Sequence, residues 1–166
     1  MIIIGMKIKE FDWKNWKPTE KAVLCFIIEN NRILLIRKKK GLGAGKINGP
    51  GGRIEPGEKA IDAAIRETEE EVGLTPLGVE EKAELSFVFV DGFSIFVKVF
   101  TAFKYTGILG ETDEADPIWF DLDKIPYNEM WEDDLLWLPR IISGNQIKAR
   151  FIYEEEKILD FDVTVL

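Results

Sequence analysis

Three glutamates, Glu67, Glu70 and Glu71, lie close together in a segment that has the periodicity of an amphipathic helix. At about 100° per residue, the three side chains occupy an arc of about 100° on one face of that helix. Like charges three or four residues apart destabilise a helix by a few tenths of a kcal/mol per pair, so the cluster favours a neutralising cation. Because a hard divalent cation prefers oxygen ligands, these residues indicate a metal site. A solvated acidic face is the alternative interpretation.

A glycine-dense, basic segment directly precedes this helix. Residues 41–57 contain seven glycines and two prolines, too many for regular structure throughout. Glycine lets the backbone approach a phosphate group closely, and cations beside a metal site suit a polyphosphate ligand. We therefore expect Lys38 and Arg53 to bind terminal phosphates, with an exposed, solvated turn as the alternative. The other basic residues in this segment or just before it are Lys39, Lys40 and Lys46.

Arg66 lies between the glutamates in the sequence. Its guanidinium group can hold one of the carboxylates in place by a charge-assisted hydrogen bond. This neighbour favours the metal site over the solvated face, because it gives the acidic cluster a fixed arrangement.

The composition excludes several classes of active site. A length of 166 residues suits one domain, and an apolar share of 46% is enough for a sizeable core. The chain has no histidine, which excludes a histidine general base, a histidine-ligated zinc and a Ser-His-Asp triad. The single cysteine, Cys25, excludes an internal disulfide and a cysteine-rich metal site. Its apolar neighbours predict a buried, inert thiol.

The charge balance bears on partners and location. Lys and Arg number 22 and Asp and Glu number 30, which gives a net charge of −8. The mean field therefore repels nucleic acid and anionic membrane. No apolar stretch approaches the roughly 18 residues of a membrane span, and the N-terminal segment turns charged too early for a secretory signal. We expect a cytoplasmic protein that binds neither nucleic acid nor membrane and is a monomer or a weak homodimer.

The elements that must position these residues follow from apolar periodicity. Strand pairs are expected at 22–29 with 32–38 and at 84–90 with 93–104, joined by Asn30-Asn31 and Asp91-Gly92 as hairpin turns. A short strand is expected at 117–121 and a last pair at 147–153 and 157–165. Helices are expected at 58–72 and 130–143. Strands mixed with two helices in irregular order indicate an α+β fold, an α/β/α sandwich with a mixed sheet.

The first helix has an apolar stripe that is expected to face the core. Its members fall within about 60° of one another, well away from the glutamates, and they are Ile61, Ile65, Thr68 and Val72. Gly73 is the expected C-terminal stop of this helix.

The glutamates and the residues before them resemble the signature of a known family. Gly52, five residues, Glu58, seven residues and then Arg-Glu-Thr-Glu-Glu-Glu-Val-Gly-Leu at 66–74 look like a complete Nudix box. Thr68 stands where the family usually has an aliphatic residue. The resemblance implies the Nudix fold, a mixed sheet flanked by helices, over residues 21–166. Residues 1–20 lie outside it as an N-terminal extension.

Two further stretches are similar to one group within that family, the oxidised purine nucleoside triphosphate hydrolases. They are Lys-Gly-Leu-Gly-Ala-Gly-Lys-Ile-Asn-Gly at 40–49 and Met-Trp-Glu-Asp-Asp-Leu-Leu-Trp-Leu-Pro at 130–139. This resemblance implies hydrolysis of 8-oxo-dGTP and related nucleotides to a monophosphate and pyrophosphate. Such an enzyme sanitises the nucleotide pool and thereby contributes to DNA repair.

The resemblance also implies a magnesium site, with Mn²⁺ as a substitute. The Gly51 carbonyl, Glu67, Glu70 and Glu71 would hold the metal, and Glu71 would also activate water, with Glu70 and Arg66 beside it in the catalytic group. Glu114 matches a further acidic residue that in the family can reach the metals. A solvated loop acid is the alternative interpretation of Glu114.

In the same group of enzymes, the matching residues Asn48, Trp131, Asp133 and Asp134 would hold the base, and Phe87 would line the pocket. Trp131 offers a stacking face, and burial beside it should raise the pKa of one aspartate so that it can donate as well as accept. The alternative is that both aspartates are first-turn acids favoured by the helix dipole, with Trp131 and Trp137 in the core.

Other functions are open at this point. Family members that act on ADP-ribose or dinucleoside polyphosphates typically carry a Pro or Tyr after the box, and residues 77–104 contain neither. An RNA cap is a further candidate substrate. Isopentenyl diphosphate isomerase shares the fold but has histidine in its metal site, which this chain lacks. A nucleotide-sensing module without turnover usually loses box glutamates, and this chain keeps all of them.

Overall fold

The computed structural model describes residues 6–166, so the first five residues of the expected N-terminal extension lie outside the described residues. Nine strands form one sheet in the order β11-β10-β6-β7-β1-β2-β3, with β4 paired to β1 and β9 paired to β2. The strands of this sheet are β1 (Glu20–Glu29), β2 (Arg32–Lys38), β3 (Ile47–Asn48), β4 (Gly51–Arg53), β6 (Glu80–Phe89), β7 (Ser94–Ala102), β9 (Ala115–Asp121), β10 (Ile147–Glu154) and β11 (Lys157–Val165). A separate pair joins β5 (Leu74–Leu77) to β8 (Lys104–Gly107).

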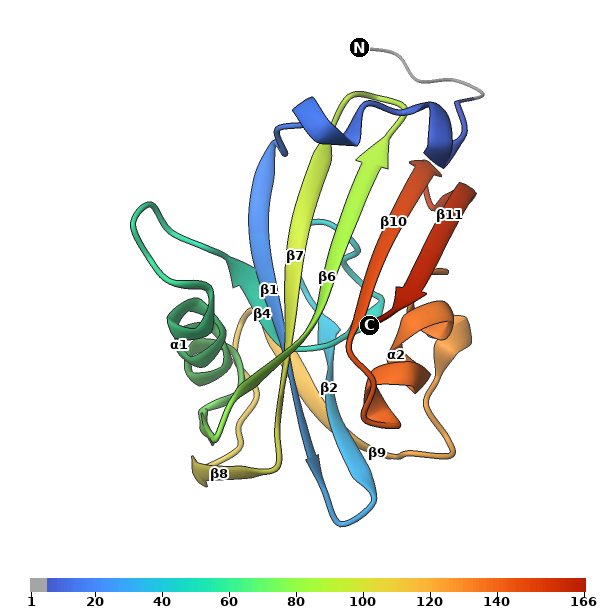
Figure 1. The fold of residues 1–166 in the computed structure, drawn as a ribbon. Coiled ribbons are helices and arrows are strands. Elements are labelled where there is room, and N and C mark those ends of the chain that lie inside the picture. The colour runs from blue at the N-terminus through green and yellow to red at the C-terminus, as the bar shows by residue number, and fades with distance from the viewer. Residues whose placement is uncertain (1–5) are drawn as a thin grey trace.

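The main sheet is mixed and is flanked by two α-helices, which confirms the expected α+β class. Strand β1 runs parallel to β7 and β10 runs parallel to β6, while the other neighbours are antiparallel. Helices α1 (Ala60–Val72) and α2 (Asp134–Ile142) lie on opposite sides of the strands in Figure 1. Short 3₁₀ turns are η1 (Ile8–Glu10), η2 (Trp13–Asn15) and η3 (Tyr127–Glu129). Among the described residues, no helix is long and apolar enough to cross a membrane.

Both expected hairpins form. Asn30 and Asn31 adopt positive φ angles of 53° and 62° between β1 and β2, as a two-residue turn requires. Gly92 has a φ of 101° between β6 and β7. Helix α1 ends at Gly73, whose φ of 80° is the left-handed conformation that favours glycine.

Other boundaries differ from the sequence prediction. The glycine-dense segment is not wholly irregular, because β3 and β4 lie within it and pair with β2 and β1. The second helix begins at Asp134 rather than at 130, since residues 127–129 form the turn η3. Strands β5 and β8 were not expected, because Leu74–Leu77 contains a proline and Lys104–Gly107 continues a segment that reads as one long strand.

The predicted core face of α1 is right for Thr68 and Val72, which are fully buried, and wrong for Ile61. Ile61 is 38% exposed, whereas Ala63 and Ala64 are fully buried in a cluster with Val23 and Cys25 of β1. Alanines allow the helix backbone to approach the strand closely, so the helix is turned with its alanine side to the sheet. This rotation moves the acidic face from solvent to the edge of the sheet, and Glu71 becomes buried there.

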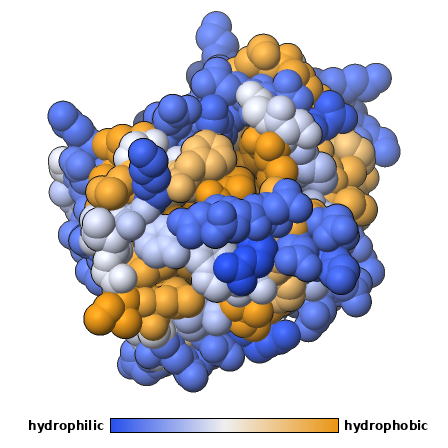
Figure 2. All heavy atoms as spheres, turned by 90° about the horizontal axis from the view of Figure 1, so that it is seen from below, coloured by the Kyte–Doolittle hydropathy of each residue, from blue (hydrophilic) through white to orange (hydrophobic). Residues whose placement is uncertain are grey.

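The two faces of the sheet contain different clusters. Helix α2 packs through Trp137, Leu138 and Ile141 on the largest one, which includes residues from β1, β6, β7 and β10. The N-terminal segment crosses the upper ends of the strands in Figure 1 and packs through Ile8 on Val88 and Ile152. Seen from below, hydrophobic residues form several separate patches among hydrophilic ones (Figure 2).

Candidate active site

Arg66, in the middle of α1, joins this helix to the loop before it. Its Nε and Nη2 donate to the two carboxylate oxygens of Glu58 at 2.8 and 2.9 Å, a bidentate pair. Nη1 donates to Glu67 at 2.8 Å and to Glu70 at 3.3 Å, and Nη2 also donates to the Arg53 carbonyl at 3.1 Å. The bond from Arg66 lowers the pKa of Glu58 to about 2, with help from the Glu55 backbone amide. Arg66 therefore orients the side chains of Glu67 and Glu70 on α1 and ties them to the preceding loop.

Glu71 is the buried carboxylate of the cluster, with 4% of its surface exposed. Its Oε1 accepts a hydrogen bond from the Gly51 amide at 2.9 Å, which fixes the side chain against β4. Several effects together raise the pKa of Glu71 to about 8. Burial is the largest of them, and the negative charges of Glu67 and Glu114 act in the same direction, while the Gly51 hydrogen bond and Lys38 lower the pKa. The site therefore carries more negative charge than its own cations balance.

Two glycines of β4 allow close packing, Gly51 against strand β1 and Gly52 against helix α1. A Cβ atom on Gly51 would lie 2.0 Å from the Val23 carbonyl oxygen. A Cβ atom on Gly52 would lie 2.4 Å from the carboxyl carbon of Glu67. Any larger residue at either position must displace the backbone or the glutamate.

The donor set fits a hard divalent cation, although the ligands are not preassembled. Among residues 6–166, no group of three or more acidic or sulfur side chains already surrounds one point. Glu71 instead bonds to Gly51, and Glu67 and Glu70 bond to Arg66, because like charges cannot converge without a cation between them. All available donors are oxygens, which is the ligand type of magnesium and manganese. The negative charges of Glu67 and Glu114 repel the carboxylate of Glu71, and a divalent cation at this place would neutralise them.

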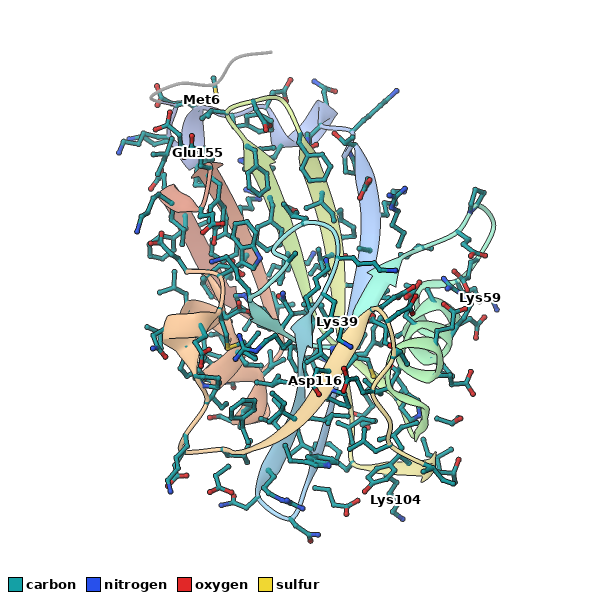
Figure 3. All side chains as sticks on the ribbon, turned by 180° about the vertical axis from the view of Figure 1, so that it is seen from behind. Met6, Lys39, Lys59, Lys104, Asp116 and Glu155 are labelled. Carbon is teal, nitrogen blue, oxygen red and sulfur yellow. The ribbon has the colours of Figure 1, made fainter. Side chains whose placement is uncertain are left out.

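One pocket, with a volume of about 170 Å³, brings most of the expected site residues together. Asn48, Phe87, Trp131, Asp133 and Asp134 line it, together with Lys38, Gly51 and Glu71 from the acidic side. Lys38 ends β2 at the start of the basic loop, and Figure 3 shows the next residue, Lys39, near the middle of the molecule beside Asp116 of β9.

Five other expected site residues do not line this pocket: Arg53, Arg66, Glu67, Glu70 and Glu114. The Arg53 side chain is 76% exposed, pairs with Glu20 at 3.5 Å and faces a neighbouring hollow. Glu70 is about half exposed on the outer side of α1. Glu114 lies in an exposed loop, close enough for its charge to raise the pKa of Glu71.

The apolar walls of the pocket are aromatic. Trp131 stands edge-on to Phe89 and Tyr153, with ring centroids 6.2 and 5.6 Å away. Phe87 stacks on Phe151 at 5.2 Å, so it is part of both the pocket and the core. Gly43 of the basic loop touches Trp131, since a Cβ atom there would lie 2.6 Å from Nε1. A flat ring can enter between such walls.

The acid pair lies at the inner end of the pocket, at the start of α2. Asp133 and Asp134 are 4% and 5% exposed. Burial raises the pKa of both carboxyl groups, and the charge of Asp133 raises that of Asp134 further. Asp133 makes no helix-capping bond with its side chain, unlike the expected first-turn acid. It bonds instead to Trp137, which is wholly buried in the core.

Tyr153 is a site residue that the sequence reasoning missed. Its hydroxyl donates to Asp133 at 2.6 Å, from β10 across to α2. The alternation of the strand places Tyr153 on the same side as Ala149 and Phe151, facing the core. That alternation was visible in the sequence, but nothing local connected it with an aspartate 20 residues away.

Comparison with known proteins agrees with the geometry. The family model for the NUDIX domain matches residues 18–141. An oxidized purine nucleoside triphosphate hydrolase of Danio rerio is 38% identical over 137 residues, which cover 82% of this chain and 88% of that protein. The protein of the same name from Mus musculus is 35% identical over 134 residues, 80% of this chain and 86% of that one.

A solved structure, the MutT protein from Bacillus halodurans, has the same fold. It superimposes with a TM-score of 0.77 at 22% sequence identity, over 87% of this chain and 97% of that one. The Nudix box, the fold and two relatives of nearly full length agree, and the chain belongs to the Nudix family and is a Nudix hydrolase.

Proposed function

We propose that the protein hydrolyses oxidised purine nucleoside triphosphates such as 8-oxo-dGTP to the monophosphate and pyrophosphate, with Mg²⁺ as cofactor. The observation that carries this proposal is that one pocket contains both the buried acid pair Asp133–Asp134 and the buried Glu71. The names of the relatives from Danio rerio and Mus musculus support the same substrate class. The biological role would be to remove oxidised nucleotides before a polymerase can insert them into DNA.

In this proposal the acidic side of the pocket performs the hydrolysis. The Gly51 carbonyl, Glu67, Glu70 and Glu71 would hold Mg²⁺ or Mn²⁺, with Glu114 near enough to contribute charge. When bound, the ion supplies charge neutralisation at the phosphates and lowers the pKa of water. Glu71, which the Gly51 amide holds inside the pocket, would accept the proton of the attacking water, because the charge of the bound ion would lower its raised pKa and keep it ionised.

The basic and aromatic parts of the pocket bind the nucleotide. Lys38 lines the pocket together with Glu71 and would bind a phosphate oxygen. Arg53 reaches the phosphates only if its exposed side chain leaves Glu20. Trp131 offers a face for the base, Phe87 supports the wall behind it, and the amide of Asn48 is available for a polar contact.

The test is the value of kcat/KM with Mg²⁺ for 8-oxo-dGTP, 2-oxo-dATP, dGTP and ADP-ribose, with the products identified. We expect a preference of about tenfold or more for an oxidised purine triphosphate over dGTP. Equal rates on dGTP, or a preference for ADP-ribose, would keep the hydrolase and reject the sanitising role. Binding of the nucleotides without turnover of any would indicate a sensing module.

A further inference from the structure

Thr112 lies in the loop before β9, and its hydroxyl group makes three hydrogen bonds to backbone atoms. Its Oγ1 donates to the carbonyl of Glu71 at 2.9 Å. The same oxygen accepts from the amides of Glu114 and Ala115, each at 3.3 Å. A threonine hydroxyl has one proton and two lone pairs, so each of them has a partner here. One side chain therefore joins the backbones of two acidic residues, Glu71 and Glu114, that are far apart in the chain.

Backbone hydrogen bonds fix the rest of this loop, residues 110–115, to the same side of the molecule. The Gly110 amide donates to the Val72 carbonyl at 3.0 Å, at the C-terminal end of α1. The Lys39 amide donates to the Glu114 carbonyl at 3.0 Å, which continues the pairing of β2 with β9 by one residue. The main chain of Glu114 is thus held between α1 and the end of β2, although its side chain is exposed.

From this position the carboxylate of Glu114 acts on the acidic cluster of α1. Burial is the largest cause of the raised pKa of Glu67 and of Glu71, and the charge of Glu114 acts in the same direction on both. A carboxylate that is held in place before a cation binds contributes more than one on a loop that must first be ordered, because ordering costs conformational entropy. The bonds that hold this loop therefore bear on how tightly the cluster binds a cation.

We infer that Thr112 is a positioning residue for the metal site: its hydroxyl group keeps the Glu114 carboxylate beside Glu67 and Glu71 and thereby tightens the binding of a divalent cation. This inference rests on the metal site of the proposed function and extends it to a neutral residue outside the acidic cluster. Glu114 is then a member of the charged site with a fixed backbone, and not a solvated loop acid.

The first test measures Mn²⁺ binding to the nucleotide-free protein at pH 7, from the EPR signal of free Mn²⁺. Thr112→Val keeps the shape of the side chain and removes the hydroxyl group, so we expect Mn²⁺ to bind about tenfold more weakly. Thr112→Ser keeps the hydroxyl group and should bind Mn²⁺ within about twofold of the wild-type protein.

Thr106→Val is the matched control for this test. Thr106 is an exposed threonine of β8, and among residues 6–166 its hydroxyl group has no hydrogen bond. We expect its replacement to leave the affinity for Mn²⁺ unchanged. Wild-type affinity in Thr112→Val, or an equal loss in Thr106→Val, would overturn the inference.

A double-mutant cycle tests whether Thr112 acts through Glu114. Glu114→Gln removes the charge that Thr112 is inferred to position. If this is the route, then Thr112→Val added to Glu114→Gln should weaken Mn²⁺ binding by no more than about twofold. A further tenfold loss in the double variant would show that Thr112 acts on Glu71 through its carbonyl, and would reject the role assigned to it.

Amide hydrogen exchange without metal checks the geometry itself. The Ala115 amide donates to Thr112 Oγ1, so its exchange should be about tenfold or more faster in Thr112→Val and close to the wild-type rate in Thr112→Ser. The bonds from Gly110 and Lys39 remain in both variants, so we expect both to stay folded. Exchange of Ala115 at the wild-type rate in Thr112→Val would mean that the hydroxyl group does not hold the loop, and the inference would fall.

These tests also separate the inference from the proposed function. They use no nucleotide, so hydrolysis of a substrate other than an oxidised purine nucleotide would reject the proposed function and leave the inference standing. A wild-type protein that binds no Mn²⁺ would reject both the metal site and the inference.

Discussion

Glu71 and Asp134 line the same pocket and are both buried, but their carboxyl groups have different partners. Glu71 accepts a bond from the Gly51 amide, whereas Asp134 lies beside the charge of Asp133. The sequence pointed to both residues through a motif, because residue types at fixed spacing carry chemical information. It could not reveal that Tyr153 joins Asp133, because that contact depends on the pairing of β10 with β6 and on where α2 packs.

At the residue scale, Glu71→Gln tests the assignment of the base. Glutamine keeps an oxygen that can accept from the Gly51 amide, but it cannot take a proton from water. We expect Mg²⁺-dependent turnover to fall by about 10²–10⁴-fold while the melting temperature does not fall. The matched control is Glu69→Gln on the same helix, where the glutamate is exposed and bonds to Thr75. Turnover retained in Glu71→Gln, measured with the preferred nucleotide, would show that another group is the base.

Asp134→Asn tests how much the buried acid pair lowers the stability of the folded protein at high pH. Burial and Asp133 raise the folded-state pKa of Asp134 well above its usual value near 3.9. A raised pKa means that the folded state binds the proton more tightly, so this contribution to stability is complete below the unfolded pKa and is lost as pH rises through the folded pKa. Asparagine cannot ionise and does not incur this loss.

We therefore expect Asp134→Asn to melt about 2–4 °C above the wild-type protein at pH 8, the shift that one kcal/mol produces in a domain of this size. The difference should shrink towards pH 4. Asp123→Asn removes the same charge from an exposed position and serves as the control. Melting curves over this pH range check the prediction, and a variant less stable than the wild-type protein at pH 8 would contradict it.

At the scale of elements, the sequence predicted where α1 lies better than how it is turned. Periodicity and the stop at Gly73 locate the helix, because both are local properties. Its orientation depends on Ala63 and Ala64, which contribute little to an apolar stripe but allow the closest approach to β1. The consequence is functional, since the same rotation buries Glu71 against β4.

The short strands likewise depend on packing that local sequence properties do not reveal. β4 is three residues long and contains two glycines, so neither apolar alternation nor strand propensity identifies it. It forms because the backbone of β1 offers a partner, in the register Val23 with Gly52. Side chains on either glycine would collide with Val23 or Glu67, so the glycines reflect packing as well as loop flexibility.

At the scale of the whole molecule, the N-terminal segment that contains η1 and η2 packs on the face of the sheet opposite the pocket. Along β6 the side chains of Phe87 and Phe89 line the pocket, while Val88 between them points to the opposite face. Ile8 packs against Val88 there, and the Trp16 indole donates to Ser94 at 3.1 Å at the start of β7. The family match begins at residue 18, so this support precedes the matched domain.

This arrangement predicts that the segment stabilises the domain without taking part in the reaction. Ile8 is 6% exposed, so Ile8→Ala should lower the free energy of unfolding by about 2–4 kcal/mol. Ile61→Ala is the matched control: Ile61 is 38% exposed on α1, and its truncation should cost about 1 kcal/mol or less.

Urea unfolding measures both changes, and kcat/KM at a temperature where both variants are folded measures activity. Because Ile8 packs with Val88 and Ile152, neither of which lines the pocket, activity should be retained within about twofold, well under one kcal/mol of transition-state stabilisation. A large loss of kcat/KM in folded Ile8→Ala would instead mean that the segment determines the shape of the pocket.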